Sequence, residues 1–184
     1  MASPSDFTWL PRGVQRLLGI DFDIRGAIQL RAADGFVEKE QMDAPGSVTL
    51  AADGRNAGAI AALVLMNFPV DGDPNADAAV LVTLNYADRT RAQLPIRAGR
   101  DVQHWRRQSG LSDTARLATL GYDARILPEF WRRVRLYAVS VANPHPEKPL
   151  REIAFTAGKG MGAAPVLFAV TLQPMASDPA TATR

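Results

Sequence analysis

The chain has 184 residues, of which 47% are hydrophobic and 22% charged, and its formal net charge is +2. These values suit one globular domain and exclude an intrinsically disordered chain. A net charge this small gives no strong field for a phosphate backbone, so we expect no nucleic-acid partner. The chain has no cysteine, which excludes disulfides, thiol catalysis and cysteine-ligated metals.

We expect no signal peptide at the start of the chain. Residues 1–12 lack the basic and apolar regions of a signal peptide, and we expect them to be an irregular lead-in. No apolar run reaches the roughly 18–20 residues that span a bilayer, so we expect no membrane insertion. Residues 13–173 are predicted to form a single domain, followed by a flexible tail over residues 174–184.

The first predicted strand covers residues 19–30, in which apolar and polar side chains alternate. Ile20, Phe22 and Ile24 share one face, as the two-residue period of a strand requires. The alternation shifts near Arg25, so we expect a bulge or a bend there.

The central part of the chain predicts four more strands. Residues 47–51 form a short apolar segment, and residues 59–68 form a continuous apolar run that indicates a strand buried on both faces. Residues 78–88 and 90–99 are separated only by a short turn, which predicts a β-hairpin.

The C-terminal part predicts three strands, over residues 132–144, 150–158 and 165–173. Before them, residues 100–128 are irregular, and residues 114–124 are compatible with a short helix or a long loop. The eight strands predict an all-β protein with at most one or two short helices. Because helices do not alternate with the strands, we expect an antiparallel two-sheet β-sandwich of the jelly-roll type.

One loop places oxygen-bearing side chains at every second position, a spacing at which they converge on a calcium ion. These residues are Asp71, Asp73, Asn75 and Asp77. The helix–loop–helix calcium pattern also needs glycine at its sixth position and glutamate at its twelfth, which here are Ala76 and Val82. The sequence leaves two interpretations open, a calcium site and a solvated turn. Calcium is the only cofactor that the sequence suggests.

The chemistry-bearing residues do not form a catalytic pattern. The glycine-rich stretch from Gly158 to Gly162 leads into Pro165 and a predicted strand, whereas a phosphate-binding loop leads into a helix. His104 and His145 lie far apart and have no metal-ligand partner at helical spacing. Because a GxSxG nucleophile motif is also absent, we expect the protein not to be an enzyme.

Aromatic side chains are the candidate ligand contacts. Sugar rings stack on aromatic rings while neighbouring polar groups bind their hydroxyls. Trp131 precedes a predicted strand, and Tyr122 and Trp105 lie in or beside the irregular segment, where side chains can reach solvent. The alternative for each ring is packing at the end of a sheet.

Several short stretches together resemble a bacterial family. They are residues 10–13, 19–30, 84–88, 94–105, 143–144 and 165–171. Their order is similar to that of galactose-binding-like, carbohydrate-binding β-sandwich modules, which are appended to FecR-type anti-sigma factors and secreted hydrolases. The chain departs from that pattern at Arg89, where the family usually has glycine. The matching positions Asp101 and Trp105 imply a turn-fixing role.

The resemblance implies a non-catalytic binding module whose partner is a glycan or another extracytoplasmic ligand. A protein-interaction or oligomerisation domain is the alternative, and it would use a sheet edge or an apolar patch. The resemblance implies an extracytoplasmic location, whereas a complete chain without a signal peptide would be cytoplasmic.

Overall fold

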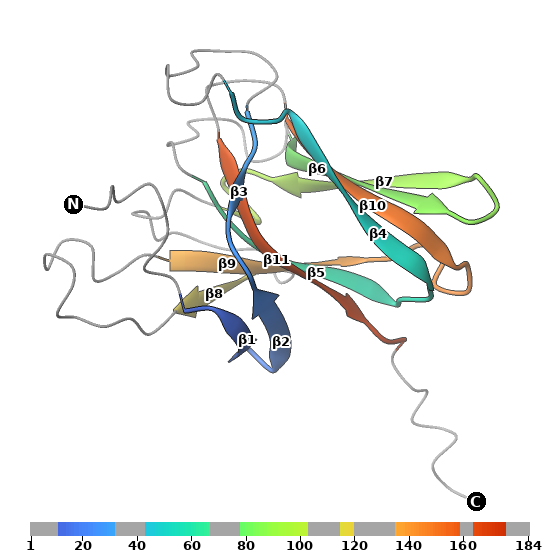
Figure 1. The fold of residues 1–184 in the computed structure, drawn as a ribbon, viewed down its shortest axis with the longest axis horizontal. Coiled ribbons are helices and arrows are strands. Elements are labelled where there is room, and N and C mark those ends of the chain that lie inside the picture. The colour runs from blue at the N-terminus through green and yellow to red at the C-terminus, as the bar shows by residue number, and fades with distance from the viewer. Residues whose placement is uncertain are drawn as a thin grey trace, which may run out of the picture.

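The computed structural model describes residues 11–31, 43–66, 78–102, 115–119, 135–158 and 164–175. Every regular element in these ranges is a β-strand, and all neighbouring strands within its sheets are antiparallel (Figure 1). The all-β, antiparallel prediction is therefore confirmed. None of the described segments is a helix long and apolar enough to cross a membrane.

The strands form two larger sheets and one hairpin. The hairpin pairs β1 (Gly13–Leu17) with β2 (Ile20–Ile24). The four-stranded sheet has the order β4 (Ser47–Arg55), β10 (Leu150–Ala157), β6 (Ala78–Tyr86) and β7 (Arg91–Arg97). The five-stranded sheet has the order β3 (Ile28–Gln29), β11 (Pro165–Gln173), β5 (Ala59–Met66), β9 (Arg135–Ala142) and β8 (Ala115–Thr119).

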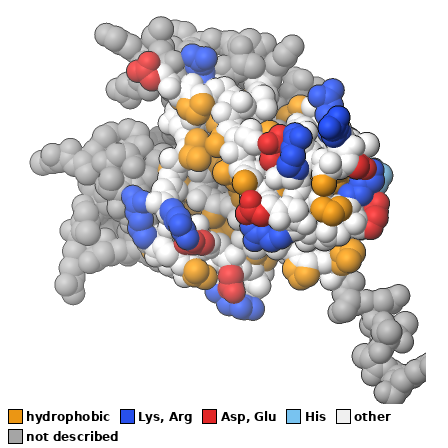
Figure 2. All heavy atoms as spheres, turned by 45° about the vertical axis from the view of Figure 1, so that its right-hand side comes forward, with side chains coloured by type: hydrophobic (Ala, Val, Ile, Leu, Met, Phe, Trp, Pro, Cys, Tyr) orange, Lys and Arg blue, Asp and Glu red, His pale blue; other side chains and the backbone are white. Residues whose placement is uncertain are grey.

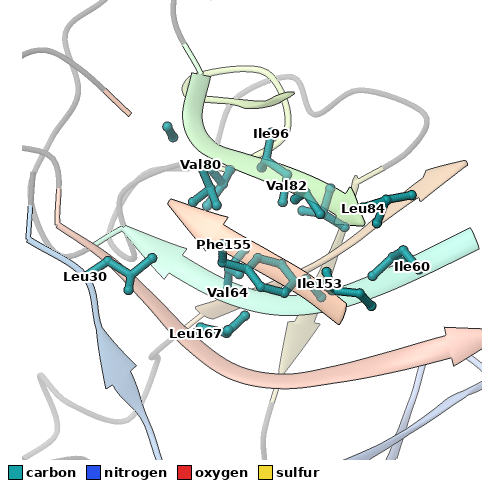
Figure 3. Close-up of a cluster of buried hydrophobic side chains, with 14 of the residues drawn as sticks. Leu30, Ile60, Val64, Val80, Val82, Leu84, Ile96, Ile153, Phe155 and Leu167 are labelled. Atoms are coloured by element: carbon teal, nitrogen blue, oxygen red, sulfur yellow. The ribbon is translucent and has the colours of Figure 1, made fainter. Parts of the chain in front are cut away.

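The main core lies between the two larger sheets. Alternate side chains of β6 and β10 point inward, so that Val82, Leu84 and Phe155 are fully buried. They meet Ile60 and Val64 of β5, which project from the facing sheet (Figure 3). This apolar layer makes the two sheets a sandwich.

A second apolar layer covers the other face of the five-stranded sheet. Phe22 and Ile24 of β2 pack with Leu63, Leu65 and Phe168. Strand β5 is central in its sheet and supplies side chains to both layers, which explains its continuous apolar sequence. The prediction that the run 59–68 is buried on both faces is confirmed for β5.

The structure also differs from the predictions in its strand count. Residues 19–30 form two strands, because the chain leaves the β1–β2 hairpin near Arg25 and joins the edge of the five-stranded sheet as β3. The helix or loop expected within residues 114–124 is wrong for residues 115–119, which pair with β9 as strand β8. Strand β1 was not predicted, since the exposed Val14 and half-buried Leu17 give it no clear apolar face.

Candidate functional site

The residues proposed from the sequence as ligand contacts lie outside the described ranges. These residues are Trp105, Tyr122 and Trp131, and the candidate calcium ligands Asp71, Asp73, Asn75 and Asp77. Among the side chains that the structure does describe, no group of three or more metal-ligating residues is found. The glycan and calcium assignments of these seven residues therefore stay predictions.

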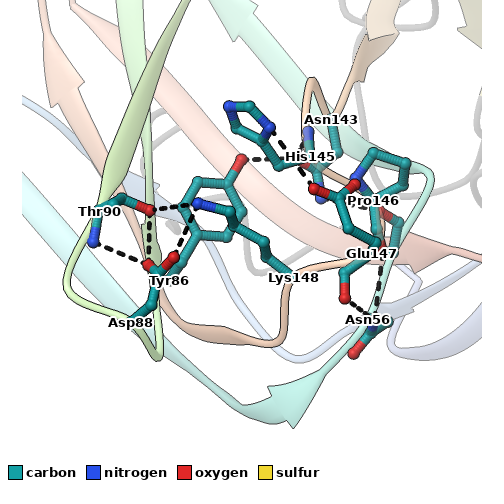
Figure 4. A network of polar contacts seen from close by, with 10 residues as sticks. Asn56, Tyr86, Asp88, Thr90, Asn143, His145, Pro146, Glu147 and Lys148 are labelled. Carbon is teal, nitrogen blue, oxygen red and sulfur yellow. Dashed lines mark hydrogen bonds and ion pairs between the residues drawn. The ribbon is translucent and has the colours of Figure 1, made fainter.

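At one end of the sandwich, Asn143 joins the loop after β9 to two other segments. Its Oδ1 accepts a 2.6 Å hydrogen bond from the hydroxyl of Tyr86 (Figure 4). Its Nδ2 donates to the carbonyl of Ala57 at 2.8 Å. Its Oδ1 also accepts from the backbone N–H of His145 at 3.0 Å. Asn143 and Tyr86 are buried, so each of these bonds replaces one that water would otherwise supply.

A charged layer lies next to this buried pair. The Nζ of Lys148 is 2.7 Å from Oδ2 of Asp88, donates to Oγ1 of Thr90 at 3.0 Å, and lies 5.6 Å from the centre of the Tyr86 ring. The backbone N–H and hydroxyl of Thr90 both donate to Oδ1 of Asp88. We call Tyr86, Asp88, Thr90, Asn143 and Lys148 the loop clamp.

The loop clamp perturbs the titration of two of its members. The hydrogen bond from Lys148, assisted by those from Thr90, lowers the pKa of Asp88 well below its ordinary value. Burial raises the pKa of the Tyr86 hydroxyl, and the negative charges of Glu147 and Asp88 add to that rise. The contacts of the clamp therefore favour the ionised form of Asp88 and the neutral form of Tyr86.

The hydrogen bonds of the loop clamp are directed at other parts of the clamp and the backbone. Asn56, on the loop before β5, likewise donates to the carbonyls of Pro146 and Glu147. Such mutual satisfaction indicates a structural role. These hydrogen bonds fix the β6–β7 turn and the loop between β9 and β10 against each other.

The outward side of the four-stranded sheet presents polar groups of a different kind. Alternate positions of β6, β7 and β10 point away from the core, which we call the outer face. Its polar side chains include Thr83, Asn85, Arg91, Gln93, Arg97 and Glu152. The strand register aligns Glu152, Asn85 and Arg91 in one row across three strands, and places Thr83 beside Gln93 in the next row.

Short contacts order the side chains within these rows. The Nδ2 of Asn85 donates to Oε1 of Glu152 at 3.3 Å, and the Nε2 of Gln93 donates to Oγ1 of Thr83 at 3.5 Å. A bulge in β10 inserts Arg151 beside Glu152, and its guanidinium donates to the same Oε1 at 3.0 Å. A bulge lets two consecutive residues face outward, which a regular strand does not allow.

The outer face can bind hydroxyl-rich ligands. Amide, carboxylate and guanidinium groups each present two donors or acceptors, and here they stand on a rigid backbone. This surface was not predicted from the sequence, because Glu152 is 67 residues from Asn85 along the chain. The polar residues at alternate positions of 81–85 and 91–97 were the available signal.

Aromatic stacking is not supplied by the described residues. Phe22, Tyr86, Tyr137, Phe155 and Phe168 are all buried. On the side that Figure 2 views, the described hydrophobic side chains occur in small, separate groups among polar and charged ones.

Comparison of the chain with protein families, with curated proteins and with solved structures finds no match.

Proposed function

We propose that this protein is a non-catalytic β-sandwich binding module whose ligand is a carbohydrate. The observation that carries the proposal is the ordered polar row of Glu152, Asn85 and Arg91 on the outer face. The resemblance to galactose-binding-like modules supports the same ligand class. The loop clamp contributes by fixing the turn that separates Asn85 from Arg91.

Aromatic residues complete the proposed site. Trp131 and Tyr122 are the rings that would stack on the sugar, with Trp105 as a third contact. Calcium bound by the loop of residues 71–77 is a further proposal. It predicts that chelation weakens binding, because oxygen ligands of that loop would otherwise repel each other.

A glycan-array screen of the purified chain tests this proposal, with and without calcium. The informative variants are Asn85→Ala, Gln93→Ala and Trp131→Ala, and the matched control is Gln15→Ala on β1, in a different sheet. We expect saturable binding that the first three variants weaken and the control preserves. Absence of binding to every glycan in both conditions would overturn the carbohydrate proposal.

A second candidate function, protein interaction, rests on the β1–β2 hairpin. The side chains of Val14 and Leu18 are 66% and 52% exposed. Two exposed aliphatic side chains on one hairpin are a candidate contact for another protein. If the hairpin docks a protein, the variant Val14→Ser/Leu18→Asn should abolish capture of that partner while it leaves glycan binding unchanged. Sedimentation of the wild-type chain would show whether the partner is a second copy.

A further inference from the structure

The arginines of the outer face indicate the charge of the ligand. Arg91 and Arg97 both point outward from β7, and Arg91 is exposed. Neither guanidinium makes a hydrogen bond or ion pair with another residue in the described ranges. The single carboxylate among the polar residues of this face, that of Glu152, already accepts from Arg151 and Asn85. Among the residues that the structure describes, no carboxylate therefore neutralises the guanidinium charges of β7.

This arrangement contrasts with that of Arg16 and Arg25, which form ion pairs. Arg16 pairs with Asp21 at 3.3 Å, and Arg25 pairs with Asp23 at 2.8 Å, both in or next to the β1–β2 hairpin. The carboxylate partner of a paired arginine neutralises its charge. The guanidinium groups of Arg91 and Arg97 have no such partner among the described residues, so their N–H donors are available to a ligand. A guanidinium fork matches the geometry of a carboxylate or a sulfate and binds it through two parallel hydrogen bonds.

We infer that the ligand of the outer face is an acidic polysaccharide, one whose sugar units carry carboxylate or sulfate groups. This inference rests on the proposed carbohydrate-binding function and names the class of glycan. Arg91 and Arg97 hold the acidic groups, while Asn85, Gln93 and Thr83 bind the hydroxyls of the same chain.

The geometry of the face favours a stretch within a polysaccharide chain. Adjacent strands lie about 4.8 Å apart, so the row from Glu152 to Arg91 spans roughly 10 Å. A nucleic acid has the same sign of charge, but it is held on such surfaces by base stacking on aromatic rings. The described residues of this face offer hydroxyl-binding amides instead, from Asn85 and Gln93.

The test measures binding of four immobilised probes to the full chain. They are polygalacturonate, which carries carboxylates, chondroitin sulfate, which carries both acidic groups, neutral dextran, and a single-stranded oligonucleotide. We expect binding to one or both acidic polysaccharides, which then identifies the acidic group. Affinity should fall as salt rises from about 50 mM to about 500 mM, because counterions screen exposed charges.

Two double variants separate the outer face from net charge. We expect Arg91→Gln/Arg97→Gln to weaken binding by about tenfold or more, since two charge-assisted contacts are lost. The control Arg16→Gln/Arg25→Gln removes the same charge and should leave the affinity unchanged. Circular dichroism of both variants verifies that they fold.

Each contrary outcome has a distinct meaning. Equal binding of dextran and the acidic probes would overturn the inference and leave carbohydrate binding standing. Equal losses in the two double variants would also overturn it, because net charge alone would explain them. Binding of the oligonucleotide but of no polysaccharide, or of no probe at all, would overturn the inference, whereas the proposed function is overturned only by absence of binding across the whole glycan array.

Discussion

At the scale of single residues, the backbone at Arg89 is in a conformation that its side chain disfavours. Its φ is +71°, in the left-handed region where the Cβ of an L-residue crowds the following carbonyl. Glycine has no Cβ and would remove that crowding, so Arg89 stands in a turn whose conformation favours glycine.

Replacing Arg89 with glycine should raise the free energy of unfolding by about 0.5–1 kcal/mol. Relief of the left-handed strain outweighs the greater freedom of glycine in the unfolded chain. Urea denaturation measures the change, with Gln93→Gly in β7 as the control. We expect that control to be destabilised by about 0.5–1 kcal/mol, since glycine weakens a regular strand. A destabilised Arg89→Gly variant would contradict the strain argument.

Gly158 is required for another reason, the close approach of two backbones. A Cβ added there would lie 1.5 Å from the carbonyl oxygen of Ala78. At the same point the backbone N–H of Gly158 donates a hydrogen bond to the carbonyl oxygen of Ala79. The glycine-rich sequence from Gly158 to Gly162 does not by itself predict this contact, because only the paired strands reveal it.

Gly158→Ala should therefore lower the free energy of unfolding by about 3 kcal/mol or more, at the upper end of overpacking effects, since the obstructing atoms are backbone. Gly46→Ala is the matched control, because a Cβ there meets no atom within 4 Å. Thermal denaturation of both variants measures the difference. A Gly158→Ala variant as stable as the control would show that β6 and β10 separate easily at this end.

At the scale of elements, the loop clamp couples the β6–β7 turn to the loop between β9 and β10. Lowering of the Asp88 pKa means that folding favours the ionised carboxylate. Its contribution to stability is then complete above the pKa of an unfolded aspartate, about 3.9. It is lost as the pH falls from there toward the depressed pKa of the folded state.

The variant Asp88→Asn tests this coupling, because an amide keeps an acceptor for Thr90 but loses the charge that binds Lys148. At pH 7 we expect it to be less stable than the wild type, and the difference should shrink as the pH falls below about 4. Urea denaturation across that range measures the convergence. Lys148→Met should reproduce the same pattern, whereas a difference that stays constant with pH would show that Asp88 acts only through its turn.

At the scale of the whole molecule, the parts predicted from sequence are those that depend on local pattern. The burial of β5 on both faces and the β6–β7 hairpin follow from apolar runs and from a short turn. The conformation of the residues in β8 was ambiguous from the sequence, because this five-residue strand is defined by its pairing with β9 and not by its own pattern. The outer face depends on the register of β10 against β6, which local sequence does not encode.

The second apolar layer decides whether the β1–β2 hairpin belongs to the cooperative unit. Phe22 is fully buried against the five-stranded sheet, and the hydroxyl of Thr171 in β11 donates to the carbonyl of Asp21 beside it. Packing of this kind ties a two-stranded hairpin, which is marginal alone, to the body of the protein.

We therefore expect Phe22→Ala to lower the free energy of unfolding by about 3–5 kcal/mol, as much as Phe155→Ala in the main core. Both variants should still unfold in one transition, with coincident curves by circular dichroism and calorimetry. A loss well below 1 kcal/mol in Phe22→Ala alone would mean that the hairpin detaches while the sandwich stays folded. Val14 and Leu18 would then be carried on a separable arm, whereas a cooperative loss means that they are presented on a surface as rigid as the outer face.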